Sequence, residues 1–143
     1  MRMFVCGLIA TVSCVNFACK KDSTSLPSET YYLYNYSSGI AKDAGLFTIQ
    51  KQSNGTAALS IQLSQEYRAP GIQLSAFLTT ADTSNLVFAT LGEVNGASGT
   101  GVVNPVKTDG DNQSVPYDSL ISKKGYSVRI LNMSNVQASG SIR

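Results

Sequence analysis

Short stretches in which apolar and polar residues alternate dominate the body of this chain of 143 residues. Four of them, 56–64, 72–79, 125–131 and 136–143, place an apolar residue or glycine at almost every second position. A period of two residues is typical of a β-strand with one face buried and one face in water. The residues expected to point into the core are Ala57, Leu59, Ile61, Leu63, Ile72, Leu74, Ala76, Leu78, Tyr126, Val128, Ile130, Val136, Ala138, Gly140 and Ile142.

A fifth stretch, from Asn85 to Leu91, is apolar on both faces and predicts a central strand buried on both sides. Turn residues such as Asn-Gly, Pro-Gly and Asp-Gly separate the stretches, and no long helical period stands out. We therefore expect an all-β domain of about seven to nine short antiparallel strands. An immunoglobulin-like β-sandwich is the favoured arrangement, and a small open β-barrel is the alternative.

The N-terminal residues follow a different pattern, which indicates an export signal. Arg2 supplies a short positive region, and Met3 to Ala18 form an apolar segment interrupted by small or polar residues. A membrane-spanning helix needs about 20 largely apolar residues, so this segment is too short and too interrupted to span. Cys19 follows directly, and after it the chain becomes polar and contains proline up to about residue 30.

The sequence Phe17-Ala18-Cys19 resembles the lipobox of bacterial lipoproteins, in which the cysteine becomes the lipidated first residue of the mature chain. Asn16 departs from the usual Leu or Val three residues before the cysteine, and Cys14 is the alternative lipidation site. The resemblance implies a signal peptide at 1–18, lipidated Cys19 with a flexible tether through residue 29, and one domain at 30–143. It also implies export and anchoring in the outer membrane, on either its surface or its periplasmic face.

From Gly45 onward, the order of the expected elements resembles the CHRD domain. The residues that carry the resemblance are Gly45, Phe47 and the strand 57–63 in the early part, and Leu120, Gly125, Tyr126, Val128 and Gly140-Ser141-Ile142 in the late part. Many CHRD domains have histidines on a central strand and near the end, whereas this chain has none. The resemblance thus implies a CHRD-like domain without any role that depends on those histidines.

Composition excludes several kinds of chemistry. The absence of histidine rules out Ser-His-Asp and Cys-His catalytic arrangements. All three cysteines lie at or before Cys19, so the domain has neither an internal disulfide nor the usual zinc ligands. A net charge of +2 without a basic cluster argues against a nucleic-acid partner. Glu29, Glu66 and Glu93 are scattered and form no obvious catalytic pair, so we expect neither enzymatic activity nor a cofactor.

Three groups of residues remain as candidate sites. Tyr32, Tyr34 and Tyr36 are expected on one strand face, where they could stack against a glycan or a protein, or else cover the edge of the core. Asp109 and Asp111 form a weak calcium candidate, for which a solvated turn is the alternative. Ser23 and Ser119 each follow an aspartate and resemble the bacterial O-glycosylation acceptor.

The sequence therefore predicts a non-catalytic lipoprotein of the outer membrane or cell surface that binds a protein or glycan partner. Its attachment to the membrane would be through the N-terminal lipid. The alternatives are a periplasmic accessory subunit of an envelope or secretion assembly and, less favoured, a small hydrolase.

Overall fold

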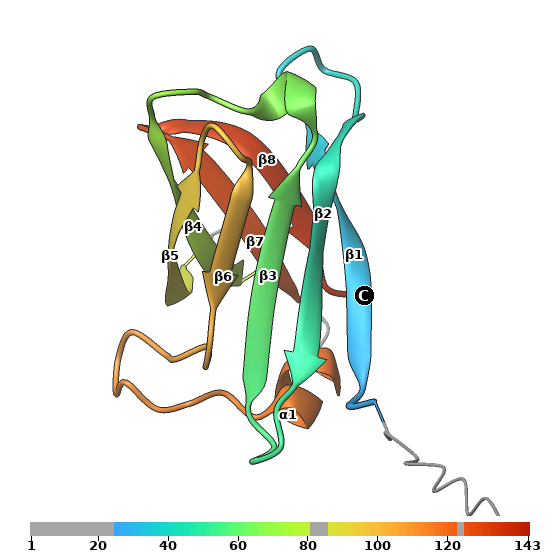
Figure 1. The fold of residues 1–143 in the computed structure, drawn as a ribbon, viewed down its shortest axis with the longest axis vertical. Helices are drawn as coiled ribbons and strands as arrows, with labels where there is room; N and C mark the ends of the chain where they lie inside the picture. Colours follow the sequence, from blue (N-terminus) through green and yellow to red (C-terminus); the bar gives the residue numbers. More distant parts are fainter. Residues whose placement is uncertain (1–24, 81–85, 123–124) are drawn as a thin grey trace, which may run out of the picture.

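A closed barrel of antiparallel strands forms the body of the protein in the computed structural model, which describes residues 25–80, 86–122 and 125–143 (Figure 1). The order around the barrel is β1-β2-β3-β6-β5-β4-β7-β8, and β8 returns to β1. The strands are β1 (Ser28–Asn35), β2 (Lys42–Lys51), β3 (Ala57–Leu63), β4 (Gln73–Thr80), β5 (Val87–Asn95), β6 (Thr100–Val103), β7 (Tyr126–Asn132) and β8 (Asn135–Ser141). β1 thus begins two residues before the predicted start of the domain.

The all-β class, the antiparallel pairing and the expected number of strands are confirmed. The arrangement corresponds to the alternative prediction of a small barrel, except that the barrel is closed and not open. The favoured immunoglobulin-like sandwich is not confirmed. The reason is that β1 pairs with β2 on one side and, through Tyr34 and Ser139, with β8 on the other. Closure leaves the described sheet without the two free edges that an open sheet would present.

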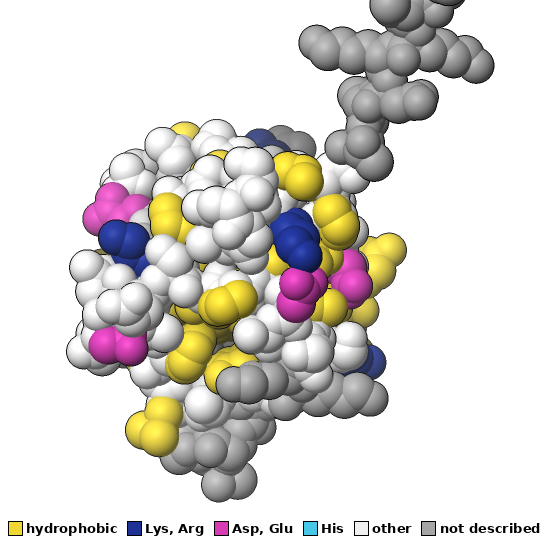
Figure 2. Space-filling view, turned by 90° about the horizontal axis from the view of Figure 1, so that it is seen from below, with side chains coloured by type: hydrophobic (Ala, Val, Ile, Leu, Met, Phe, Trp, Pro, Cys, Tyr) yellow, Lys and Arg dark blue, Asp and Glu magenta, His cyan; other side chains and the backbone are white. Residues whose placement is uncertain are grey.

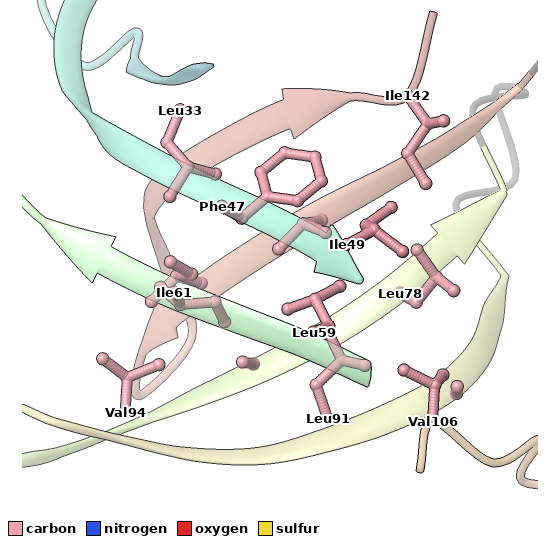
Figure 3. Close-up of a cluster of buried hydrophobic side chains, with 14 of the residues drawn as sticks. Leu33, Phe47, Ile49, Leu59, Ile61, Leu78, Leu91, Val94, Val106 and Ile142 are labelled. Atoms are coloured by element: carbon pink, nitrogen blue, oxygen red, sulfur yellow. The ribbon is translucent and has the colours of Figure 1, made fainter. Parts of the chain in front are cut away.

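Apolar side chains fill the interior of the barrel (Figure 3). They come from every second position of the strands, and Leu33, Phe47, Ile49, Leu59 and Leu78 are almost fully inaccessible to solvent. A barrel of eight strands is just wide enough for such side chains to fill it. Because the inside is packed, a binding surface on this domain has to lie on the outer face or at the ends.

Short helices lie at the two ends of the barrel (Figure 1). η1 (Gln65–Tyr67) follows β3 at one end and contributes buried Tyr67 to the core. α1 (Tyr117–Ser122) lies at the opposite end and contributes buried Tyr117 and Leu120. Each helix therefore places large side chains where the interior would otherwise open to water.

Two residues that were expected to point inward are exposed. Ile72 precedes β4, where its N–H donates to the Ala69 carbonyl at 3.1 Å, so it belongs to a turn and not to the alternating strand. Val136 lies opposite Leu131, beyond an irregularity in the β7–β8 register that follows Ile130. A bulge of this kind moves the residues after it to the other face of the strand, so the simple alternation fails there.

The prediction that 85–91 is buried on both faces is wrong for the part that the structure describes. Leu86 and Val87 are exposed, whereas Ala89 and Leu91 are buried. β5 belongs to a barrel made of one sheet, so only its inner face meets the core. Asn85 lies outside the described residues, and Tyr126, expected to be in the core, is half-buried at its margin.

Candidate functional site

Three tyrosines form a row on the outside of the barrel. Tyr32 and Tyr34 occupy outward positions of β1, and Tyr36 follows one residue after the end of the strand. The ring centroids are 6.3 Å apart between Tyr32 and Tyr34 and 6.4 Å apart between Tyr34 and Tyr36. Tyr32 and Tyr36 are 61% and 56% exposed. We call these three residues the tyrosine row.

The tyrosine row borders a hollow of about 190 Å³ between β1 and β8. Hydroxyl groups of Ser139 and Ser141 on β8 and of Ser127 on β7 line it, together with Arg143. Figure 1 likewise shows the end of the chain beside β1. Aromatic faces, hydroxyl groups and a guanidinium are thus brought together, which suits a ligand that is flat on one side and polar at its edges.

The close approach of β8 to β1 depends on Gly140. A Cβ atom at this position would lie 2.2 Å from the Tyr32 carbonyl oxygen and 3.1 Å from the ring of Phe47. Real side-chain atoms cannot approach a backbone oxygen so closely, so only glycine allows the strands to meet here. The residue that closes the barrel therefore also shapes the hollow beside the tyrosine row.

Buried Asn35 holds the end of β1 in place. Its side-chain nitrogen donates to the Gln137 carbonyl on β8 at 2.7 Å. Its side-chain oxygen accepts from the N–H and the hydroxyl of Ser37, at 3.0 and 2.6 Å. A buried amide that is hydrogen-bonded through both its nitrogen and its oxygen restrains the backbone around it, so Tyr36, which lies between Asn35 and Ser37, is carried on an ordered segment.

Tyr31 covers the edge of the core, the alternative role considered for the other tyrosines. Its ring stacks on Phe47 with centroids 5.2 Å apart. Its hydroxyl donates to Glu29 at 2.7 Å. Burial and this bond to a carboxylate raise the pKa of Tyr31 above its ordinary value. Tyr31 covers this part of the core, whereas Tyr32 and Tyr36 of the tyrosine row remain exposed.

Asp109 and Asp111, the calcium candidates, direct their carboxylates to different protein groups. Asp109 accepts from the N–H and the hydroxyl of Thr90 on β5, both at 2.7 Å. Asp111 accepts from the Thr108 hydroxyl and from the Gln113 N–H, and these hydrogen bonds lower the pKa of its carboxyl. Within the described ranges, no three acidic, histidine or cysteine side chains gather as a metal site.

Ser119, a predicted O-glycosylation site, lies in α1 and is half-buried. The aspartate before it, Asp118, forms an ion pair with Lys51 on β2, with 2.7 Å between nitrogen and oxygen. The other predicted modification sites, Cys19 and Ser23, lie outside the described residues, as does the alternative, Cys14.

The glutamates considered as catalytic acids sit on three separate elements. Glu29 is on β1, Glu66 is in η1 and Glu93 is on β5, and all three are exposed. Among the residues that the structure describes, no Asp or Glu side chain lines the hollow beside the tyrosine row.

The residues that the sequence analysis missed are Ser127, Ser139, Ser141 and Arg143. They reach the tyrosine row only because β8 closes the barrel against β1, about a hundred positions earlier in the chain. Strand alternation places Ser139 and Ser141 on an outward face, but nothing in it says which strand lies next to them.

Among the helices that the structure describes, none has the length and apolar character needed to cross a membrane. Comparison with protein-family models, with curated proteins and with solved structures finds no match for this chain.

Proposed function

We propose that this protein is a non-catalytic binding module that holds a glycan or protein partner on the tyrosine row. The observation that carries the proposal is the exposure of adjacent tyrosine rings beside a hollow lined by hydroxyl groups. Tyrosine contributes a large, rigid surface with a polar tip and is enriched among residues that dominate binding energy. Because Gly140 and Asn35 order this region before any ligand arrives, little conformational entropy is lost on binding.

The test of the binding role is a double substitution, Tyr32→Ala with Tyr34→Ala, in the full chain. Removing two central aromatic contacts is expected to weaken binding at least about tenfold, as for typical hot-spot residues. Binding would be measured on a glycan array and by cross-linking to partner proteins in intact cells. Met133→Ala is the matched control, because Met133 is a large side chain that is 86% exposed elsewhere on the barrel. Unchanged binding in the tyrosine variant with normal folding would overturn the proposal.

We further propose that lipid on Cys19 anchors the module to the outer membrane. The support comes from the sequence: an apolar segment after Arg2, a small residue before the cysteine, and a polar tether after it. Cys19→Ala is expected to abolish labelling with palmitate and to release the protein from membranes. Cys14→Ala serves as the control, and labelling that is lost in this variant instead would assign the lipid to Cys14.

A further inference from the structure

The outer face of β1, β2, β3 and β6 carries a continuous band of uncharged side chains that begins at the tyrosine row. Cross-strand register aligns one line of outward residues across the four strands: Thr30, Thr48, Ser60 and Val102. A second line runs beside it: Tyr32, Leu46, Gln62 and Thr100. We call these two lines, with Gln50 next to them, the neutral band.

Most charged residues of these four strands lie away from the neutral band. Asp43 is the exception: it lies opposite Tyr34 of the tyrosine row, and its carboxylate accepts a hydrogen bond from the Gly45 N–H at 3.0 Å. Lys42, the first residue of β2, lies opposite Asn35. Glu29 and Lys51 belong by alternation to the other face of their strands, and Lys51 pairs with Asp118 of α1. Figure 2, which views the barrel from below, shows charged side chains at that end only in small, separate groups.

Two separate hollows lie along the neutral band. The hollow beside the tyrosine row is lined by Thr30, and a second hollow of about 160 Å³ is lined by Thr48, Gln50, Ser60 and Val102. The Thr30 and Thr48 hydroxyl oxygens are 2.8 Å apart, so the walls of the two hollows are in contact at this hydrogen bond. Neighbouring strands lie about 4.8 Å apart, so the path from β8 to β6 is roughly 19 Å long.

We infer that the ligand of this surface is a neutral polysaccharide lying across the strands from the tyrosine row to Val102. This inference rests on the proposed function and specifies its ligand. A charged partner would be recognised by opposite charges, which the neutral band lacks, whereas a neutral sugar chain offers hydroxyl groups and apolar ring faces. Threonine, serine and glutamine supply hydrogen-bond donors and acceptors for the sugar hydroxyl groups. Tyrosine supplies a flat surface on which the apolar faces of the sugar rings can stack.

Arg143 is the charged side chain that lines the hollow, at the end of the path on the β8 side. A guanidinium donates hydrogen bonds to sugar hydroxyl groups as well as to anions. The inference therefore predicts that anionic polysaccharides bind no better than neutral ones, and a uronate polymer is the direct comparison.

The test is affinity electrophoresis of the full chain in gels that contain laminarin, xyloglucan or galactomannan, with polygalacturonate as the anionic comparison. We expect at least one neutral polymer to retard the protein, and longer fragments of that polymer to compete better than its disaccharide. Gln50→Glu places a charge under the bound chain and should weaken binding about tenfold, because the charge must be desolvated. Gln73→Glu is the matched control, an exposed glutamine at the start of β4.

The inference would be overturned by retardation with polygalacturonate alone, by retardation with none of the neutral polymers, or by equal effects of Gln50→Glu and Gln73→Glu. If Tyr32→Ala still removes binding of another partner in any of these cases, the proposed function stands and only the ligand class is wrong. A second copy of the chain as occupant would appear as a dimer that Gln50→Glu dissociates, and this would also overturn it. Retardation that Tyr32→Ala leaves unchanged would count against the proposed function itself.

Discussion

Lys51 at the end of β2 and Asp118 in α1 form an ion pair of 2.7 Å, and the Lys51 ammonium also lies 5.8 Å from the centre of the Tyr117 ring. The pair ties the short helix to the barrel wall, while Leu120 of the same helix is buried in the core. The ion pair and the buried leucine both hold α1 over the end of the barrel. They should stabilise the fold by different amounts, because the ion pair is exposed to solvent and Leu120 is not.

Lys51→Met should therefore lower the free energy of unfolding by no more than about 1 kcal/mol, the usual range for an exposed ion pair. Leu120→Ala should lower it by about 2–4 kcal/mol, through lost burial and the cavity left behind. Urea denaturation of both variants measures the difference, with Lys42→Met as control for removing a lysine. A larger loss in Lys51→Met than in Leu120→Ala would show that the ion pair and not the core holds α1.

Gly140→Ala should destabilise the protein by about 2–4 kcal/mol and weaken ligand binding, because strong steric conflicts are among the largest mutational effects. The new Cβ would lie 2.2 Å from the Tyr32 carbonyl oxygen and force β8 away from β1. Gly110→Ala is the control, since a Cβ there meets no atom within 4 Å. Thermal unfolding and the electrophoretic assay would report the two effects. Equal stability of the two variants would mean that β8 can shift without loss.

Asp109→Ala should destabilise the barrel by about 1–2 kcal/mol, because it removes the two hydrogen bonds from the N–H and the hydroxyl of Thr90, which is exposed and can then bond to water. Asp109 also donates its own N–H to the Phe88 carbonyl, so the side chain and backbone together tie the loop after β6 to β5. We expect calcium to leave the unfolding temperature of the natural protein unchanged. A rise with millimolar calcium that Asp109→Ala removes would instead establish the metal site.

Stability should fall as the pH rises above 10, in part because of Tyr31. The pKa of Tyr31 is raised in the folded protein, so above pH 10 the unfolded chain loses the tyrosine proton while the folded chain keeps it. The stabilisation is complete below the unfolded pKa and decreases as pH climbs toward the folded value. Tyr31→Phe should make the decline between pH 10 and 11 less steep in urea denaturation. An identical slope in the variant would contradict the raised pKa of Tyr31 in the folded protein, which burial and the Glu29 hydrogen bond together cause.

Much of the domain could be predicted from its sequence. Alternation identifies β3, β4, β7 and most of β8, because a half-buried strand needs a side chain of opposite character at each step. The same rule places Tyr32 and Tyr34 together on one face of their strand, and the structure shows that this face points outward. It fails at Val136, where a bulge changes the face, and at Leu86 and Val87, which are apolar and yet exposed.

Tertiary structure alone decides the rest. Local patterns are the same in a sandwich and in a barrel, since both bury one face of each strand, and closure depends on which strands become neighbours. The pairing of β1 with β8 through Tyr34 and Ser139 closes the sheet into a barrel. It brings Arg143 and the serines of β8 to the tyrosine row, and the register of β1, β2, β3 and β6 aligns the neutral band. The sequence by itself determined most of the strands and the buried faces of β3, β4 and β7, because these are set by neighbouring residues. The site depends on contacts between residues far apart in the chain, and only folding brings those together.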